Sequence, residues 1–499
     1  MALLEAQIHD VIKQWLRQAT SPPWPHALTL GRLISRALRL KRSALLQTGS
    51  LPHRYSCSYL LPCLLNPEAI HLVVTPARRE LLQTKELPQL QAWLAEHTSF
   101  SSPYHLPTLL TPAEWFAQAA QWTGQNNQLT LIEQADDLED WARDYFTVEI
   151  RPEDWQKWQG QFPHLESALI TCYEALKQSL LARPDNPHNC YFLTPEDLAC
   201  LRQSLALLLS QPVSLPKVQA LAPFWQENPE QSLLWASLDR SQGQVTLHLS
   251  PLELASYLRP YWPPRQAPLI LLGSFLDPER SATTYRQTLG LPDLLCLKFS
   301  PQRQTESIRV YLPDALPLPN TPEFQPRVFG QIQDLLHQAA PSQPTVILLD
   351  DVPLKAQLAS QLAAEFGSRV KVENFPFPAN GILISSWSAW LVAQDQRQPQ
   401  LLILATLPLP SPEHPLVAHR ISYCKRHHQD WFRGYLLPTA LRALQQAVLP
   451  LREGQGTLAI LDHRVNSRSY GREILRALEP YGRCSYLDPT DLGEFPSLG

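Results

Sequence analysis

The chain has 499 residues, 48 prolines and a formal net charge of −4, so its length suits several domains and its charge excludes nucleic-acid binding through bulk positive charge. Eight cysteines without a C-x-x-C pair argue against a disulfide scaffold. No window approaches the roughly 18 apolar residues of a membrane span, and the N-terminus, which carries Glu5 and Asp10, does not resemble a signal peptide, so we expect a soluble cytoplasmic protein without a membrane partner.

The first part of the chain alternates between helix and strand patterns. Apolar spacing predicts amphipathic helices over residues 3–19 and 28–41. Strand–turn–helix patterns follow at residues 43–65, 69–83 and 128–146. Strands that alternate with helices predict a parallel sheet that is covered on both faces.

From about residue 150 to 235 the strand signal stops, and helical patterns rich in Leu and Trp predict a helical insertion. Strands are predicted to resume at 243–249 and 267–276, and the Pro-rich segment 313–326 is typical of a linker. Beyond it, further strands are predicted within residues 344–373, 381–386, 400–410 and 456–464. The sequence therefore predicts two α/β halves with an insertion in the first.

The C-terminal part carries a more specific pattern. The segments "LATLPLPSPEHPLVAHRI" and "WFRGYLLPTALRALQQAVLPLREGQGTLAILDHR" hold polar, proline and glycine residues at fixed offsets. This spacing resembles the DinG/XPD-like branch of the superfamily 2 DNA helicases. The residues that match the family pattern are Pro438, Ala440, Gln445, Arg452, Gly456, Asp462, Arg464, Tyr470 and Gly471.

The resemblance implies an α/β fold of two RecA-like, P-loop-type parallel-sheet domains, with Mg-ATP bound between them and single-stranded DNA crossing both. We expect the first RecA-like domain to comprise residues 1–149 and 236–312, with the helical insertion at 150–235. We expect the Pro-rich linker at 313–326 to lead into a second RecA-like domain at 327–499.

The expected phosphate loop is altered. The family pattern Thr-Gly-x-Gly-Lys-Ser/Thr places Lys on the β- and γ-phosphates and a hydroxyl on Mg²⁺. Here Thr48 and Gly49 open the loop and Ser56 takes the hydroxyl position, but Tyr55 stands at the lysine and Arg54 at the second glycine. The candidate nucleotide-binding residues are Thr48, Gly49, Arg54 and Ser56, and Arg54 is left as the only charge for a phosphate.

The acidic and arginine-finger motifs are altered as well. Asp-Glu-Ala-His of the family corresponds to Glu133-Gln134-Ala135-Asp136, and Gln134 cannot accept a proton at neutral pH. In the finger motif, Leu449 stands at the first arginine. The remnant catalytic positions are Glu133, Asp136, Gln445 and Arg452. An alternative reading of the acidic stretch is a helix N-terminus whose carboxylates favour the helix dipole.

No cofactor is certain from these residues. Mg-ATP is implied by the resemblance alone, while the altered motifs argue against its hydrolysis. No cysteine lies between residues 64 and 132, so the iron–sulfur cluster that many members carry is not expected, and no metal-ligand set is predicted.

A basic stripe supplies the candidate nucleic-acid contacts. The residues Arg464, Arg468, Arg472 and Arg476 recur at intervals of four and would form one helix face. The functional interpretation is contact with phosphates, and the alternative is a solvated helix face.

Three hypotheses follow. In the first, a catalytically impaired helicase fold binds single-stranded DNA or a DNA-repair protein. In the second, an active ATP-dependent helicase uses Arg54, Glu133 and Arg452 in place of the lost groups. In the third, the chain is a structural docking partner, for example of an active paralogue. Nucleotide hydrolysis separates the second from the others, and salt-dependent DNA binding separates the first from the third.

Overall fold

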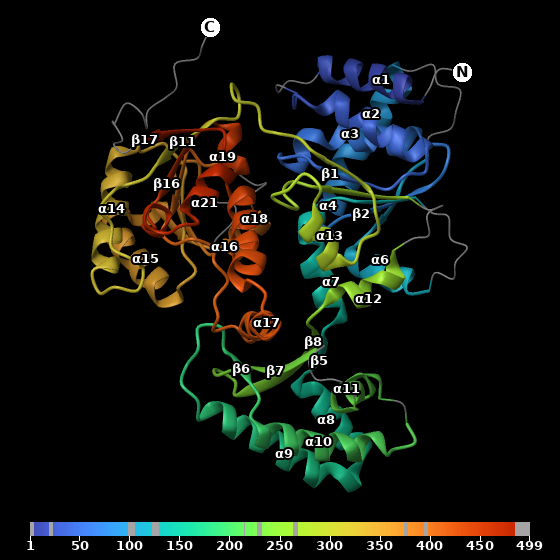
Figure 1. Cartoon of the computed structure of the whole chain (residues 1–499), viewed down its shortest axis with the longest axis vertical. Coiled ribbons are helices and arrows are strands. Elements are labelled where there is room, and N and C mark those ends of the chain that lie inside the picture. The colour runs from blue at the N-terminus through green and yellow to red at the C-terminus, as the bar shows by residue number, and fades with distance from the viewer. Residues whose placement is uncertain are drawn as a thin grey trace.

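The computed structural model describes residues 4–18, 23–97, 105–121, 129–213, 215–226, 232–262, 268–373, 378–393 and 398–484. Figure 1 shows two α/β lobes side by side and a smaller module beyond one end of both. The two lobes are each built on a parallel sheet, which confirms the predicted α/β class with two RecA-like domains.

The first lobe has a six-stranded sheet of order β10-β1-β9-β4-β2-β3. Its strands are β1 (Ala44–Gln47), β2 (Ile70–Val73), β3 (Thr108–Leu110), β4 (Leu129–Ile132), β9 (Leu269–Gly273) and β10 (Leu295–Lys298). Successive residues face opposite sides, so that Leu46 packs beneath one group of helices and Leu45 beneath another. Because all its strands are parallel, the loops after β1, β4, β9 and β10 gather at one edge of the sheet.

Helices cover both faces of this sheet. On one face lie α1 (Leu4–Gln18), α2 (Ala27–Arg39), α3 (Pro52–Leu65) and α5 (Leu87–His97). On the other lie α6 (Pro112–Ala119), α7 (Leu138–Phe146), α12 (Leu254–Leu258) and α13 (Thr283–Leu289). The short helix α4 (Pro76–Leu81) follows β2 and carries Arg78 into the interior.

The insertion is not purely helical, which corrects the prediction for residues 150–235. An antiparallel sheet of order β5-β8-β7-β6 joins β5 (Val148–Ile150), β6 (Cys190–Phe192), β7 (Ser232–Asp239) and β8 (Gln244–Pro251). It packs with α8 (Pro152–Gln161), α9 (Glu166–Leu181), α10 (Pro195–Leu209) and α11 (Pro216–Gln226). The strand predicted at 243–249 belongs here and not to the first parallel sheet, because a turn with Gly243 at φ +62° folds β8 back on β7.

The second lobe has a seven-stranded sheet of order β13-β14-β12-β15-β16-β11-β17. Its strands are β11 (Ile308–Tyr311), β12 (Thr345–Leu348), β13 (Val370–Val372), β14 (Ile382–Ser385), β15 (Leu401–Leu404), β16 (Thr457–Ile460) and β17 (Tyr481–Cys484). One face is covered by α14 (Phe324–Gln338) and α15 (Val352–Phe366). The other is covered by α16 (Trp387–Ala393), α18 (Leu437–Ala447), α19 (Leu449–Glu453) and α21 (Gly471–Ala477).

Strand β11 lies in the second sheet, whereas the predicted range 236–312 places it in the first domain. It pairs in parallel with β16 and β17, with Arg309 opposite Thr457. The chain therefore passes between the lobes in residues 299–307, which we call the connector. The Pro-rich segment 313–326 joins β11 to α14 inside the second lobe instead of linking the two domains.

The insertion also touches the second lobe. Figure 1 shows helix α17 (Pro415–Arg426) lying between the second lobe and the insertion sheet. Asn186 Nδ2 donates to the Glu413 carbonyl at 3.2 Å, and the rings of Trp235 and His414 lie 5.4 Å apart. The three modules thus contact one another pairwise.

Candidate nucleotide site between the lobes

The loop between β1 and α3 lies at the carboxyl edge of the first sheet, where the predicted phosphate loop should be. The Thr48 N–H donates to the Gly273 carbonyl at 2.8 Å, and the Gly49 N–H donates to the Ser274 carbonyl at 3.0 Å. The Ser50 N–H donates to Thr48 Oγ1 at 3.4 Å. These three backbone N–H groups of the loop are therefore engaged within the protein.

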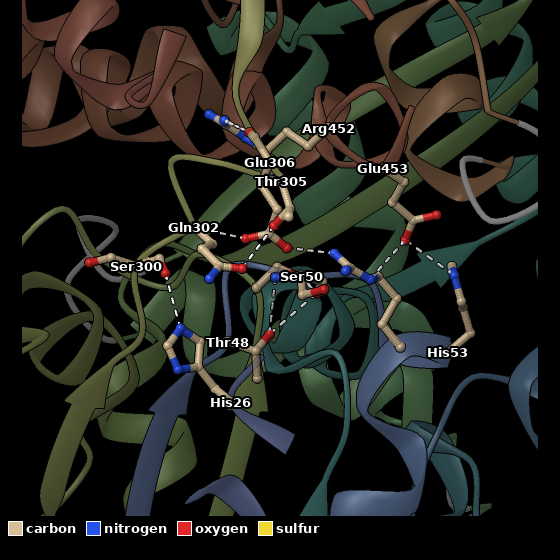
Figure 2. A network of polar contacts seen from close by, with 12 residues as sticks. His26, Thr48, Ser50, His53, Ser300, Gln302, Thr305, Glu306, Arg452 and Glu453 are labelled. Atoms are coloured by element: carbon tan, nitrogen blue, oxygen red, sulfur yellow. Dashed lines mark hydrogen bonds and ion pairs between the residues drawn. The ribbon is translucent and has the colours of Figure 1, made fainter. Parts of the chain in front are cut away.

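The connector covers this loop. Gly49 has φ +65°, a conformation that favours glycine, and a Cβ placed there would lie 3.6 Å from the Phe299 carbonyl oxygen. Beside it, the His26 ring nitrogen Nε2 lies 3.2 Å from the Ser300 carbonyl oxygen (Figure 2). The connector is thus held against the mouth of the loop.

Two carboxylates hold Arg54, which lies in the first turn of α3. Its Nη1 donates to Glu306 Oε1 at 2.5 Å, and its Nε lies 3.7 Å from Glu453 Oε1. Glu453 also lies 3.2 Å from His53 Nε2. Figure 2 shows Glu306 reaching from the connector and Glu453 from α19 toward the start of α3. The Glu306 and Glu453 side chains are 4% and 9% exposed, so these ion pairs are largely shielded from solvent.

Tyr55, at the family's lysine position, belongs to the core. It is fully buried, and its ring lies 5.7 Å from that of Trp24 and 6.1 Å from that of Tyr59. Burial raises the pKa of Tyr55 well above its ordinary value, so the side chain is a neutral phenol. Ser56, at the hydroxyl position, donates to the His53 carbonyl at 3.5 Å and lines a cavity of about 570 Å³.

Glu133 is paired inside the first lobe. It is fully buried, accepts a hydrogen bond from Tyr59 at 2.8 Å and lies 3.1 Å from Arg78 Nε. Arg78 in turn binds Glu86. Burial raises the pKa of Glu133, and the attraction of Arg78 opposes that shift. The Glu133 carboxylate thus forms a buried ion pair with Arg78 inside the first lobe.

Asp136 ties two loops together. Its Oδ2 accepts from the Ser274 N–H and its Oδ1 from the Phe275 N–H, both at 2.7 Å. A Cβ added to Gly273 would lie 2.8 Å from Asp136 Oδ2, so this approach requires glycine. Burial raises the pKa of Asp136, which those two backbone donors oppose. The residue therefore couples the loop after β4 to the loop after β9.

Arg452 and Gln445 do not face the phosphate loop. The guanidinium of Arg452 is buried and donates to the carbonyls of Leu478 at 2.7 Å, Glu306 at 2.9 Å and Pro480 at 3.2 Å. Burial lowers the pKa of Arg452 to about 10. Gln445 Nε2 donates to the Ala477 carbonyl at 3.0 Å. Arg452 thus fixes the end of the connector by binding its backbone.

The Leu449 position adds an apolar contact between the lobes. Leu449 of α19 is buried together with Leu51 and Phe275 of the first lobe. At the position of the family's first finger arginine, this chain thus has a leucine that makes an apolar contact with the first lobe.

A second ion-pair network joins the lobes on α7. Arg420 of the second lobe lies 3.0 Å from Glu139, which also binds Arg143 at 3.2 Å. Arg442 lies 4.0 Å from Asp140. Burial alone would raise the pKa of Glu139. The attraction of Arg420, Arg442 and Arg143 outweighs this effect and lowers the pKa to about 2. The acidic stretch that is open to a helix-dipole reading thus also contacts the second lobe.

The predicted arginine stripe is divided between two helices, so it is not one face. α20 (Arg464–Ser467) ends before Arg468, whose ψ of 151° is extended, and a new helix, α21, begins at Gly471. Arg464 is paired with the buried Asp462, as close as 2.5 Å. Arg468, Arg472 and Arg476 are exposed.

The described residues contain no group of three or more His, Cys, Asp or Glu side chains that could hold a metal ion. Their helices include none that is long and apolar enough to cross a bilayer. The compartment stays a prediction.

Mg-ATP does not fit the residues that are present. The amides of Thr48, Gly49 and Ser50 have protein acceptors. The first turn of α3 faces two carboxylates, from Glu306 and Glu453, where a triphosphate needs cations. The sequence reasoning missed Glu306, Glu453 and Arg420, because none of them stands at a family motif position and their pairing is visible only in three dimensions. It included Glu139 only as part of the acidic helix start.

Comparison with known proteins finds sequence and fold similarity to helicases. Residues 394–481 match the model of the helicase C-terminal domain. Over part of its length the chain is similar to DinG/XPD-like superfamily 2 helicases. It is 29% identical over 158 residues to the ATP-dependent DNA helicase YoaA of Escherichia coli, covering 31% of this chain and 23% of that protein. It is 24% identical over 285 residues to the 3'-5' exonuclease DinG of Bacillus subtilis, covering 52% of this chain and 31% of that protein.

The matched part of this DinG/XPD-like chain spans less than half the length of these relatives. In fold it is similar to S. tokodaii Xpd4, with a TM-score of 0.58 at 13% identity, covering 92% of this chain and 99% of that structure. An apo XPD structure gives a TM-score of 0.57 at 14% identity, covering 91% and 99%. These similarities agree with the predicted DinG/XPD-like family, whereas the loss of its ATPase chemistry stays a prediction.

Proposed function

We propose that this DinG/XPD-like chain binds single-stranded DNA without hydrolysing ATP. The observation that carries the proposal is the pairing of Arg54 and His53 with Glu306 and Glu453 at the first turn of α3. The β- and γ-phosphates of ATP need cations and free N–H groups at this place, and here protein carboxylates have taken the cations.

The chemistry of hydrolysis lacks its usual groups too. A positioned general base contributes about 10² to 10⁴ in rate, and Gln134 cannot serve as one. An arginine finger contributes about 10³ to 10⁵, and Leu449 is apolar while Arg452 binds backbone carbonyls. The DNA-binding half of the proposal is supported by the relatives, two of which are named as ATP-dependent DNA helicases.

The test is phosphate release from Mg-ATP by the purified chain, with and without single-stranded DNA, together with binding of a labelled oligothymidylate at several salt concentrations. We expect salt-dependent DNA binding and no DNA-stimulated hydrolysis. Hydrolysis that DNA stimulates and Arg54→Ala abolishes would show an active helicase with atypical motifs. Absence of DNA binding would leave a docking protein and contradict the proposal.

A further inference from the structure

The insertion is attached to the two lobes in different ways. It is continuous with the first lobe through α7 and α12, and Thr147 Oγ1 lies 2.8 Å from Ser250 Oγ where the chain enters and leaves it. On the second lobe it meets the start of α17, which Figure 1 shows against the insertion sheet, and the contact is made at His414. Because the first attachment is covalent, the contact with the second lobe is the one that can open without unfolding a module.

His414 is the N-cap of α17, and its ring carries the contact. Its Nδ1 accepts the Leu416 N–H at 3.3 Å, so this nitrogen carries no proton. The ring lies 5.4 Å from that of Trp235 and 5.5 Å from that of His188, both in the insertion. Leu416 packs against the buried cluster that Trp235 forms with Cys190. One neutral imidazole therefore caps the helix and packs against the neighbouring module.

A proton on this ring would oppose these contacts. An imidazolium has two N–H donors, so Nδ1 could no longer accept the Leu416 N–H. Its charge would also lie at the positive end of the helix dipole. Burial, together with the nearby His188 and His248, lowers the pKa of His414 to about 4. Protonation therefore favours a state in which the ring has left the junction.

The carboxylates around the junction interact with the other histidines. Glu149 lies 3.5 Å from His248 Nδ1, and it opposes the lowering of the His248 pKa by burial. Burial raises the pKa of Asp350, and the nearby His188 opposes that shift. Within the described residues, no carboxylate lies within ion-pair distance of His414, so nothing there compensates a charge on its ring. The charged and titratable groups around the junction are Glu149, Arg151, His188 and His248 of the insertion and Asp350 and Glu413 of the second lobe.

The other end of α17 is held by contacts that tolerate acid better. Arg420 lies 3.0 Å from Glu139, whose pKa is about 2. The Tyr423 hydroxyl donates to Glu253 Oε1 at 2.7 Å. Between pH 6.5 and pH 4 the start of α17 thus loses its hold on the insertion, while the Arg420 ion pair keeps the helix on the first lobe.

We propose that His414 is an acid-sensitive latch between the insertion and the second lobe. The neutral imidazole holds the two modules together, and the imidazolium releases the insertion, which stays attached to the first lobe. The latch needs neither nucleotide nor DNA, so it does not rest on the proposed function.

Linkage sets the size of the effect. The closed state is stabilised fully above the ordinary histidine pKa of 6.5 and loses that stability as the pH falls toward about 4. From these two values the ratio of closed to open molecules falls about 20-fold between pH 7 and pH 5. Because the ring is only half-buried and solvent weakens the effect, we expect a fall of about 5- to 20-fold.

Cys190 supplies a native probe of the opening, because its thiol is buried at this junction beside Trp235 and Leu416. The full chain is treated with a dipyridyl disulfide at pH 7 and pH 5, and labelling of Cys190 is followed by peptide mass spectrometry. The reference is His414→Asn, which keeps an oxygen that caps the helix but does not titrate. Comparison of the two proteins at the same pH cancels the intrinsic pH dependence of the thiol.

We expect equal labelling of Cys190 in the two proteins at pH 7, and about 5- to 20-fold faster labelling of the unmodified chain at pH 5. His414→Lys, which carries its charge at both pH values, should label faster already at pH 7. His427→Asn is the matched control, because this histidine lies exposed at the other end of the same helix. It should behave like the unmodified chain.

Three outcomes would overturn the latch. The first is equal labelling of the unmodified chain and His414→Asn at pH 5. The second is an effect of His427→Asn as large as that of His414→Asn. The third is labelling of Cys63 in step with Cys190, since Cys63 is buried in the core of the first lobe and its labelling reports unfolding of the protein as a whole. The same thiol shows in each variant that the fold is intact.

Discussion

We expect Glu133→Gln to destabilise the first lobe. The carboxylate is fully buried, binds Arg78 Nε at 3.1 Å and accepts from Tyr59 at 2.8 Å. The amide would leave Arg78, which is 6% exposed, with Glu86 as its remaining carboxylate. Removing one partner of a buried ion pair costs about 3–5 kcal/mol, and the retained Glu86 favours the lower end. At about 1.4 kcal/mol per factor of ten, a loss of about 3 kcal/mol raises the population of the open lobe about 150-fold.

Hydrogen exchange followed by mass spectrometry measures this opening in peptides that cover β4 and α4. Glu80→Gln is the matched control, because Glu80 lies on the same helix α4 but is exposed, and a surface change of this kind stays within about 0.5 kcal/mol. Exchange that is unchanged in Glu133→Gln would refute the reasoning that this buried ion pair stabilises the first lobe.

The other predictions concern contacts around the cleft. Gly273→Ala would press a Cβ to 2.8 Å from Asp136 Oδ2, so we expect a lower thermal midpoint, from a loss of about 1–3 kcal/mol; an unchanged midpoint would contradict the tight approach. The neighbouring arginines lower the pKa of Glu139 to about 2, so its contribution to the stability of the folded state is present above pH 4.5 and is lost as the pH falls toward 2. Glu139→Gln should therefore speed hydrogen exchange in α17, where Arg420 lies. Equal exchange of the two proteins at neutral pH would count against this contact. Burial lowers the pKa of His414 to about 4, below the 6.5 of a free imidazole. The folded state is therefore most stable with respect to this group above pH 6.5, and that stability declines as the pH falls toward 4. Helix α17 should be better protected from hydrogen exchange at pH 7 than at pH 5, after correction for intrinsic exchange rates, and His414→Gln should remove the difference.

The sheets of both lobes could be predicted from the sequence because their strands are continuous apolar runs between helix patterns. β1, β4, β12 and β15 are buried at every residue, the expected pattern for parallel strands covered on both faces. Of the insertion strands, only β8 was predicted as a strand. β5 and β6 are three residues long, and the first residues of β7 fall within the range 150–235 that was predicted to be helical. The boundary at 312 failed because proline content was taken as the sign of a domain linker, whereas pairing of β11 with β16 decides which sheet it joins.

The sequence predicted where the candidate loop lies in the fold, but not which residues it contacts. Thr48, Gly49 and Arg54 lie at the carboxyl edge of the first sheet, as a strand–turn–helix pattern predicts. The contacts of the loop could not be predicted from motif spacing. Glu306 is 252 residues away from Arg54 in the chain, and Glu453 stands at none of the positions that the family pattern specifies. Long-range ion pairs leave no periodic signal, so only the substitutions themselves, such as Tyr55 for lysine, pointed to the change.

The energetics of the cleft support the proposal that this fold binds DNA without an ATPase cycle. In nucleotide-driven members of the fold, the phosphates supply the negative charge that cations of the two lobes share; here Glu306 and Glu453 supply it. A triphosphate that entered would first break buried ion pairs, at about 3–5 kcal/mol, and displace the connector from Gly49. Even a site of about micromolar intrinsic affinity, worth about 8 kcal/mol, would then be left with about 3–5 kcal/mol, which corresponds to millimolar binding. Ion pairs such as Arg54–Glu306 and Arg420–Glu139, together with the apolar contact of Leu449, thus connect the lobes without a nucleotide.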